Sequence, residues 1–260
     1  MIELGIGAIV MAVASGVAVG FLLALFGGGG SVLAAPLLIY AVGVTDTHIA
    51  LGTSAAAVAI SALISLVGHW REHKVKWPCA TAFAVVGLLG SLAGSTVAKA
   101  TNGRHLLFLF SLAMAGIALS MLRKPKFEGD PQVHMNMKIM AKLAPLGAVT
   151  GFVAGFFGIG GGFLIVPGLM LASGMTLANA AASSLVSVAL FGGATSANYA
   201  ISGLVDWRLV LCLVGGGILG IAPGLWTAIH LVNRVRLART LFAMLVLMVA
   251  VYIAYRALAG

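Results

Sequence analysis

The chain alternates between long apolar runs and short polar gaps. The runs cover residues 4 to 26, 32 to 44, 49 to 68, 78 to 98, 105 to 122, 143 to 157, 163 to 173, 177 to 201, 208 to 229 and 240 to 255. A helix needs about 20 apolar residues to cross the hydrocarbon core of a bilayer, so most of these runs predict membrane-spanning helices. The runs 32 to 44 and 163 to 173 are too short to cross alone.

Composition narrows the class of protein. Of the 260 residues, 61% are hydrophobic and 8% are charged, whereas a soluble domain carries about 25% charged residues. A water-soluble globule is therefore excluded, and an all-α integral membrane protein in contact with the lipid bilayer is predicted. The 15 Lys and Arg residues give a net charge of +9, but they lie in the gaps between apolar runs. This placement favours charges that orient helices, with no nucleic-acid partner.

The sequence is a duplication, as a comparison of the chain with itself indicates. At a shift of 131, and of 130 after a one-residue slip, the two halves share Phe-Gly, Pro, Trp and several Gly positions. The matches include Gly20-Phe21 with Gly151-Phe152, Phe26-Gly27 with Phe157-Gly158, Pro36 with Pro167, Thr53-Ser54 with Ser183-Ser184, and Trp77 with Trp207. The predicted organisation is a first transmembrane repeat (1–122), a basic linker (123–142) and a second transmembrane repeat (143–260).

Basic residues predict how the halves are oriented. If the linker is cytoplasmic and each pair of runs around a glycine cluster forms a hairpin, 11 of the 15 Lys and Arg residues fall inside. Counting each hairpin as one crossing puts the cluster 234–239 outside, against the positive-inside rule. The favoured topology places both termini on the non-cytoplasmic side and inverts the second half, an arrangement found in many transporters. A parallel duplication or a plain bundle is the alternative.

The two glycine clusters are the first candidate site. Gly27 to Ser31 and Gly158 to Gly162 lie between apolar runs, and each opens one of the short runs. If each short run is a half-helix, its first amide groups, near Ser31 to Leu33 and Gly162 to Leu164, carry the positive end of the helix dipole and attract an anion. The predicted contacts are Gly28, Gly29, Gly30, Ser31, Gly160, Gly161 and Gly162. The alternative is that these glycines only permit close helix packing.

Hydroxyl groups form the second candidate site. Thr53 and Ser54 lie a few residues inside one long run, and Ser183 and Ser184 occupy the equivalent positions. Hydroxyls can donate to an oxyanion without placing a charge in the bilayer. They can equally bond to a helix carbonyl or join neighbouring helices. Together with the glycine clusters they predict one central anion site.

Other polar residues near the ends of the runs are weaker candidates. As residues of a vestibule or a gate we consider His48, His69, Asn179, Asn198, Tyr199, Asp206 and Arg208. All six acidic residues lie in gaps or at an end of the chain, and the sequence has no paired carboxylates, Ser-His-Asp set or metal-ligand cluster. We therefore expect no enzyme activity, no metal and no cofactor. Cys79 and Cys212 stand alone, and the N-terminus lacks the basic region of a cleavable signal peptide.

These motifs resemble the sulfite exporter TauE/SafE family of membrane permeases over nearly the whole chain. The similarity lies in G-F-x-x-x-x-F-G-G-G-G-S with Pro36, its echo with Pro167, Gly52-Thr53-Ser54, and Val205-Asp206-Trp207. The second half departs from the usual Gly-Thr-Ser with Ala182-Ser183-Ser184, and the first half has Val75-Lys76-Trp77 instead of Val-Asp-Trp. The resemblance implies a multispanning transporter of the cell inner membrane that exports small sulfur-containing anions such as sulfite or sulfoacetate.

The sequence therefore predicts a multispanning bundle of two inverted repeats, each opening with a Gly-rich hairpin that contains a half-helix. The favoured function is alternating access around a central anion site. An anion-selective channel is the main alternative, and a subunit that transports nothing is a third. The sequence leaves open the transported anion, the coupling ion, whether the chain is a monomer or a homodimer, and whether the glycine hairpins are re-entrant or fully spanning.

Overall fold

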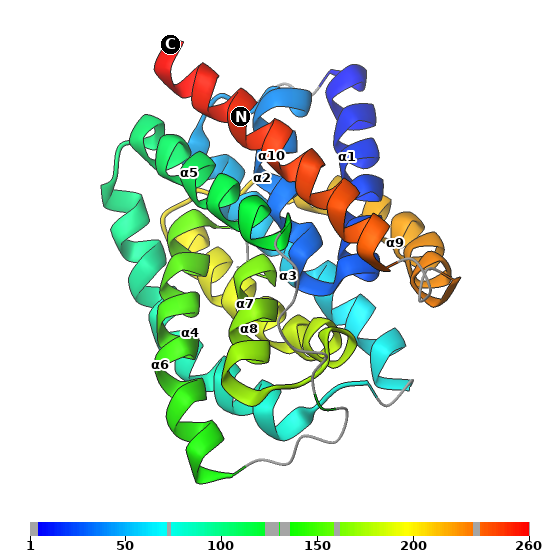
Figure 1. Cartoon of the computed structure of the whole chain (residues 1–260). Helices are drawn as coiled ribbons and strands as arrows, with labels where there is room; N and C mark the ends of the chain where they lie inside the picture. Colours follow the sequence, from blue (N-terminus) through cyan, green and yellow to red (C-terminus); the bar gives the residue numbers. More distant parts are fainter. Residues whose placement is uncertain are drawn as a thin grey trace.

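The helices of the protein follow the apolar runs. A computed structural model describes residues 5–71, 74–122, 130, 136–158, 162–230 and 235–259. This part of the chain is all-helical (Figure 1), apart from one isolated bridge between Asp130 and Met175. The first half contains α1 (Ile6–Phe26), η1 (Gly27–Leu33), α2 (Ala34–Leu37), η2 (Leu38–Val42), α3 (Thr47–Arg71), α4 (Trp77–Ala100) and α5 (Gly103–Leu122). The second half contains α6 (Met137–Phe157), α7 (Gly162–Ser173), α8 (Leu177–Ile201), α9 (Trp207–His230) and α10 (Val235–Ala259).

Polar caps and glycines set the ends of these helices. The side chain of Asn136 accepts the N–H of Ile139 at the start of α6, 2.8 Å away. Such caps satisfy amides that have no partner inside the helix. The short helical segments of both halves end at glycines in the left-handed region, Gly43 at φ +87° and Gly174 at φ +72°. These two glycines are equivalent under the shift of 131, so the duplication extends to backbone conformation.

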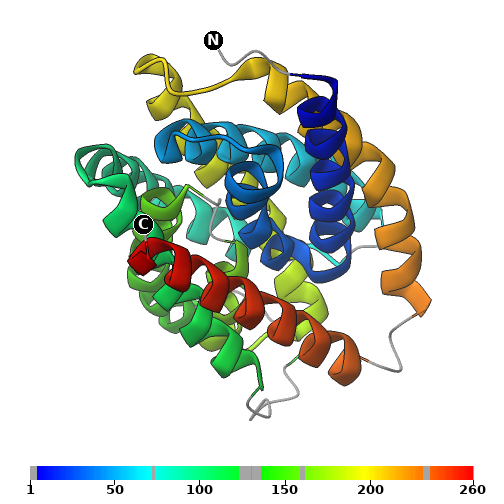
Figure 2. The ribbon, with the colours of Figure 1, turned by 90° about the horizontal axis from the view of Figure 1, so that it is seen from above.

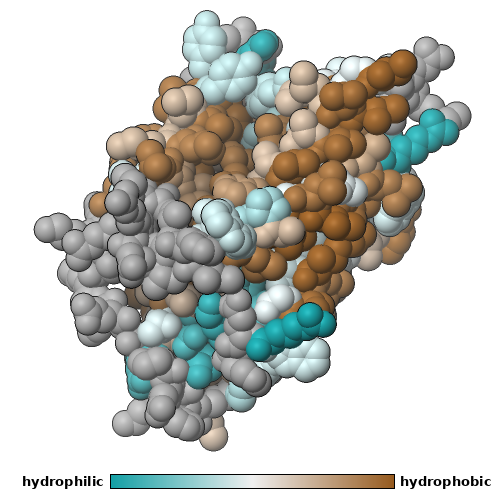
Figure 3. All heavy atoms as spheres, turned by 90° about the vertical axis from the view of Figure 1, so that its right-hand side faces the viewer, coloured by the Kyte–Doolittle hydropathy of each residue, from teal (hydrophilic) through white to brown (hydrophobic). Residues whose placement is uncertain are grey.

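Among the described residues, seven helices are long and apolar enough to cross a membrane. These candidate spans are Ile6–Phe26, Thr47–Arg71, Trp77–Ala100, Ile139–Phe157, Leu177–Ile201, Trp207–Ala228 and Thr240–Ala257. Three shorter apolar helices, Gly30–Val42, Gly103–Leu119 and Leu164–Ser173, accompany them. Figure 3 shows a face on which hydrophobic residues form a broad band, with hydrophilic residues toward its ends. The protein is therefore a multispanning helical membrane protein.

Helices of one half pack mainly against helices of the other half. α1 lies along α9 and α4 lies along α6, and these two pairs are equivalent under the repeat. Two further pairs join a helix to its own counterpart, α3 to α8 and α5 to α10. Figures 1 and 2 both show α10 beside α5. The packing therefore follows the internal duplication.

Glycines allow the α1/α9 and α4/α6 pairs to approach closely. In α1, Gly16 lies against Leu213 and Gly20 against Gly217, so α1 and α9 run in the same direction. In the α4/α6 pair, Gly147 lies against Phe83, Gly151 against Gly87 and Gly155 against Ser91. These two helices are therefore parallel as well. Small residues at such contacts are the usual means by which membrane helices pack, because lipid offers no hydrophobic driving force.

The α3/α8 pair forms the centre of the bundle and is antiparallel. Gly52, near the start of α3, lies against Tyr199 near the end of α8, and Gly192 lies against Ala59. These helices are the most buried of the seven candidate spans, with 72% of the apolar window of α3 and 67% of that of α8 inside the protein. Equivalent helices of the two halves thus run in opposite directions at the centre of the fold.

Candidate functional site

Thr53 and Ser183 make equivalent hydrogen bonds that join the two halves. The Oγ1 of Thr53 accepts the backbone N–H of Asp206 at 2.9 Å, and the Oγ of Ser183 accepts the N–H of Lys76 at 2.9 Å. Thr53 and Ser183 are 130 positions apart in the sequence, and so are Lys76 and Asp206. Both side chains are fully buried. Each hydroxyl therefore fixes a loop of the opposite half to the start of a central helix.

Ser54 lies against the glycine turn of the second half. Its Oγ is 3.0 Å from the carbonyl oxygen of Leu51 and 3.2 Å from that of Gly158 and donates to these oxygens. Gly158 has φ +63°, and a Cβ at this position would lie 2.7 Å from the Cβ of Leu51. Only glycine fits this turn without strain. Thr53, Ser54 and Gly158 define what we call the Thr53 half-site.

The second hydroxyl pair lies at the opposite end of α3/α8. Ser184 donates to the carbonyl oxygen of Ala181 at 2.7 Å, and η1, which contains Gly30 and Ser31, packs against α8. Gly30 lies against the backbone of Leu22. Ser183, Ser184 and η1 define the Ser183 half-site, the counterpart of the Thr53 half-site.

The structure does not bring the two hydroxyl pairs together. The helices α3 and α8 are antiparallel, and Gly52 faces Tyr199. The residue of α8 opposite Ser54 is therefore close to Tyr199 in sequence, whereas Ser184 lies several turns earlier in α8. At 1.5 Å per residue the two pairs are roughly 20 Å apart along the helices. A small anion cannot contact both pairs at once. The structure therefore separates the two hydroxyl pairs that the sequence analysis grouped in one central site.

The glycine clusters differ from one another in detail. In the second half α7 begins at Gly162, as predicted, and its 12 residues extend about 18 Å, less than the thickness of a bilayer core. Gly160 and Gly161 lie outside the described residues. In the first half the helical bonding begins at Gly27 as a 3-10 helix that contains Gly28 and Gly29. The amides of Ser31 to Leu33, which the sequence predicted to be free, therefore lie inside this helix.

A polar pair lies near one end of the α3/α8 pair. His48 and Tyr199 stack with ring centroids 6.3 Å apart, and Tyr199 is fully buried. A shift of 130 places Ala178 and His69 at the equivalent positions at the other end, where His69 is buried and the next residue, Asn179, is half-buried. The structure therefore places His48 beside Tyr199, a contact that the sequence did not predict.

Asn198, Asp206 and Arg208 have structural partners. The Oδ1 of Asn198 accepts from the Nζ of Lys99 at 2.8 Å. The Oδ1 of Asp206 accepts the backbone N–H of Arg208 at 2.9 Å at the start of α9. Asp206 therefore caps this helix, whereas the side chain of Arg208 is exposed.

Sequence reasoning missed two groups of buried residues. Ser65 and Ser187 are fully buried, their hydroxyls have no hydrogen-bond partner among the described residues, and the register of α3/α8 places them close together near Ser183. The spacing of Ser187 three residues after Ser184 was the available signal. Lys99 was treated only as an orientation charge, yet its Nζ also donates to the backbone oxygen of Asn198 and to Ser202 Oγ.

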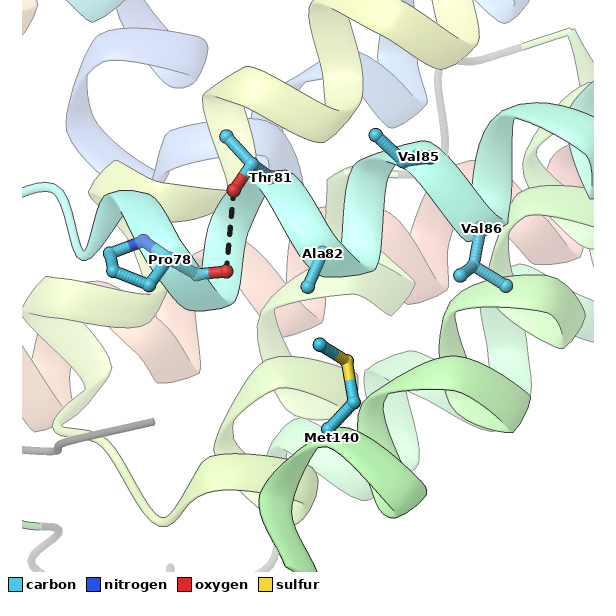
Figure 4. A pocket seen from close by; sticks show the side chains of 6 residues that line it. All are labelled: Pro78, Thr81, Ala82, Val85, Val86 and Met140. Atoms are coloured by element: carbon cyan, nitrogen blue, oxygen red, sulfur yellow. Dashed lines mark hydrogen bonds between the residues drawn. The ribbon is translucent and has the colours of Figure 1, made fainter. Parts of the chain in front are cut away.

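A shallow depression on α4 offers different chemistry. It has a volume of about 480 Å³ (Figure 4) and is lined by Pro78, Thr81, Ala82, Val85, Val86 and Met140. The hydroxyl of Thr81 faces the carbonyl oxygen of Pro78 on its own helix. The lining has no charged group, so this depression suits an apolar chain better than an anion. Within the described part of the chain, no group of three or more His, Cys, Asp or Glu residues could hold a metal ion.

Comparison with known proteins assigns the family. The sequence profile described as Sulfite exporter TauE/SafE matches residues 12–253. The chain belongs to this family of membrane transporters. A probable membrane transporter protein of Xylella fastidiosa (strain Temecula1) is 43% identical over 98% of this chain and 98% of its own length. The probable membrane transporter protein YunE of Bacillus subtilis is 28% identical over 81% of this chain and 85% of its own length. No solved structure matches the chain significantly.

Membership in the TauE/SafE family bears out the resemblance stated from the motifs. It also agrees with the expectation of a non-enzymatic protein, since the family consists of membrane transporters. The names of the relatives specify no substrate. Substrate and mechanism must therefore be argued from the site.

Proposed function

We propose that the protein exports small sulfur-containing oxyanions, such as sulfite or sulfoacetate, across the cell inner membrane by alternating access. The observation that carries the proposal is the contact of Ser54 in one half with the carbonyl oxygen of Gly158 in the other, at 3.2 Å. Hydroxyls and glycine backbone meet here between candidate spans that contain no Asp or Glu. Such a site binds an anion without an opposing buried carboxylate.

The halves are inverted repeats in this proposal, with α3 and α8 as the central pair. The antiparallel contacts of Gly52 with Tyr199 and of Gly192 with Ala59 support this orientation. A two-fold axis along the membrane normal would instead make equivalent helices parallel. The predicted cytoplasmic linker then leaves both termini outside, and the basic gap 74–76 lies inside.

The anion occupies one half-site at a time. The Thr53 half-site uses Thr53, Ser54, Gly158 and Gly162, together with Gly160 and Gly161, which lie outside the described residues. The Ser183 half-site uses Ser183, Ser184 and the segment that holds Gly28, Gly29, Gly30 and Ser31, and the unpaired hydroxyls of Ser65 and Ser187 are available to a ligand beside it. The half-sites are separated by a large part of the thickness of the bilayer core.

Binding at Ser54 would alter the contact between the halves. Its single hydroxyl hydrogen is shared between Leu51 and Gly158 in the structure. An oxyanion that accepts this hydrogen releases the carbonyl oxygen of Gly158, because a hydroxyl has only one hydrogen to donate. Anion binding therefore weakens one bond between the halves, which favours their rearrangement.

The membrane potential supplies a driving force for export without a coupling ion. An inside-negative potential contributes about 2.3 kcal/mol per charge per 100 mV. A divalent anion gains about 4.6 kcal/mol per 100 mV, which corresponds to a gradient on the order of a thousandfold. The absence of acidic residues from the candidate spans is consistent with such uniport.

A thermal-shift panel on the purified protein tests the proposed substrate class. We expect sulfite, thiosulfate or sulfoacetate to raise the unfolding temperature, with taurine and simple carboxylates as controls. A ligand at 100 times its Kd stabilises the folded state by about 2.7 kcal/mol. Equal shifts for every salt, or no shift with any sulfur oxyanion, would contradict the proposal.

A further inference from the structure

Tyr199 and His48 form a polar pair in apolar surroundings at the Thr53 end of α3/α8. Their rings stack at a centroid distance of 6.3 Å with an interplanar angle of 29°. Tyr199 is fully buried in a cluster that includes Leu51, Ala98 and Leu106. Burying the polar atoms of a phenol and an imidazole among apolar side chains is unfavourable unless they form hydrogen bonds, so packing alone does not account for this pair.

Both side chains have a polar atom without a hydrogen bond. In the part of the chain that the structure describes, the hydroxyl of Tyr199 and Nδ1 of His48 are buried and have no partner. Buried polar atoms in native proteins nearly always have a protein, water or ligand partner, because leaving them unpaired is costly. The hydroxyl of Tyr199 can donate, and Nδ1 of His48 donates in the tautomer that carries hydrogen on this atom and accepts in the other tautomer. This combination suits an oxyanion in either an ionised or a protonated form.

The pair lies beside the Thr53 half-site. Gly52 allows Tyr199 to approach α3, because a Cβ on Gly52 would lie 2.8 Å from the Cβ of Tyr199. Thr53 follows directly in the sequence and is fully buried. His48 lies one helical turn before Gly52. An anion that approaches Thr53 along α3 would therefore pass this pair.

Charged groups of both signs lie at this end. The ammonium of Lys99 donates to the residue that precedes Tyr199, and its three recorded acceptors are neutral oxygens. Two carboxylates lie nearby in the fold. Asp46 accepts the backbone N–H of His48 at 2.8 Å, and Asp206 caps α9. Both carboxylates sit at helix N-termini, where the helix dipole offsets their negative charge.

We propose that the hydroxyl of Tyr199 and Nδ1 of His48 bind the transported oxyanion as it enters or leaves the Thr53 half-site. The inference rests on the proposed function. At the other end of α3/α8 the shift of 130 places Ala178 and His69 in the positions equivalent to His48 and Tyr199. The phenol donor therefore belongs to one end of the pathway only, which gives the two ends different chemistry.

The test measures sulfite binding by thermal-shift titration of the purified full chain and two variants, Tyr199→Phe and His48→Gln. Tyr199→Phe removes only the hydroxyl, and we expect it to weaken sulfite binding about tenfold to a hundredfold, the range for one hydrogen bond to a charged group. Its unfolding temperature without sulfite should not fall, because the hydroxyl has no partner to lose. His48→Gln should weaken binding in the same direction.

Matched controls separate this inference from the proposed function. Tyr255 and His105 are exposed, so Tyr255→Phe and His105→Gln should bind sulfite like the original protein. Unchanged binding by Tyr199→Phe, or an equal loss in Tyr255→Phe, would overturn the inference and leave the proposed function standing. Failure of sulfite and all other sulfur oxyanions to bind the original protein would overturn both.

Discussion

Replacing Gly20 by leucine is expected to prevent the protein from folding stably. A Cβ at Gly20 would overlap the carbonyl oxygen of Gly217 on α9, and both partners are backbone atoms of packed helices. The helices would have to separate along their whole contact. Inserting atoms into a packed core costs about 3 kcal/mol at the upper end of the usual range, and the three further carbon atoms of leucine enlarge the overlap. The unfolding temperature in detergent measures the effect.

An equivalent glycine in the second half gives a second test of this packing, and an exposed glycine gives a control. Gly151→Leu should have the same effect, because Gly151 lies against the carbonyl oxygen of Gly87 in the equivalent α4/α6 pair. Gly116→Leu should be tolerated, since no atom lies within 4 Å of a Cβ built at Gly116. If Gly20→Leu unfolded at the same temperature as Gly116→Leu, the close approach of α1 and α9 would be wrong.

Replacing Gly158 by alanine is expected to lower sulfite transport on the order of a hundredfold, the typical loss when a group is misplaced by about 1 Å. Gly158 adopts φ +63°, and its Cβ would lie 2.7 Å from the Cβ of Leu51. Alanine would therefore shift the turn whose carbonyl oxygen accepts from Ser54. The initial rate of sulfite uptake into proteoliposomes measures the effect.

Gly174→Ala is the matched control for this variant. Gly174 also has a positive φ, +72°, but no atom lies within 4 Å of its Cβ position. Both substitutions carry the cost of a left-handed alanine, about 1–2 kcal/mol, whereas only Gly158→Ala disturbs a half-site. Equal transport by the two variants would remove Gly158 from the proposed site.

Much of the fold could be predicted from the sequence because it depends on local pattern. The length of each apolar run predicted a helix, and the short run after Gly162 became the 12-residue α7. The Trp, Pro and Gly matches predicted the duplication, which reappears in the paired bonds of Thr53 and Ser183. These features depend on residue spacing alone.

The division of the site could not be predicted, because it depends on how distant helices pair. Thr53 and Ser183 are equivalent in sequence, but the antiparallel contact of Gly52 with Tyr199 places them at opposite ends of α3/α8. Nor did the pattern indicate that Gly27 would begin a 3-10 helix while Gly158 forms a left-handed turn. Four consecutive glycines carry no side-chain information to distinguish these backbone conformations.

An inverted carrier with two half-sites differs functionally from a channel. In the proposed carrier the anion binds where the halves meet, at the contact of Ser54 with Gly158, and the halves rearrange in each cycle. Its flux therefore saturates and is stimulated by substrate on the opposite side. A continuous anion pore shows neither property and conducts many ions during each opening.

Sulfite counterflow in proteoliposomes tests the central claim most directly. Vesicles that contain the purified protein and internal sulfite should take up labelled external sulfite at a saturable rate, faster than vesicles without internal sulfite. Gly158→Ala should lose most of this uptake and Gly174→Ala should keep it. Uptake no greater than in protein-free vesicles, or large unitary currents in planar bilayers, would contradict the account.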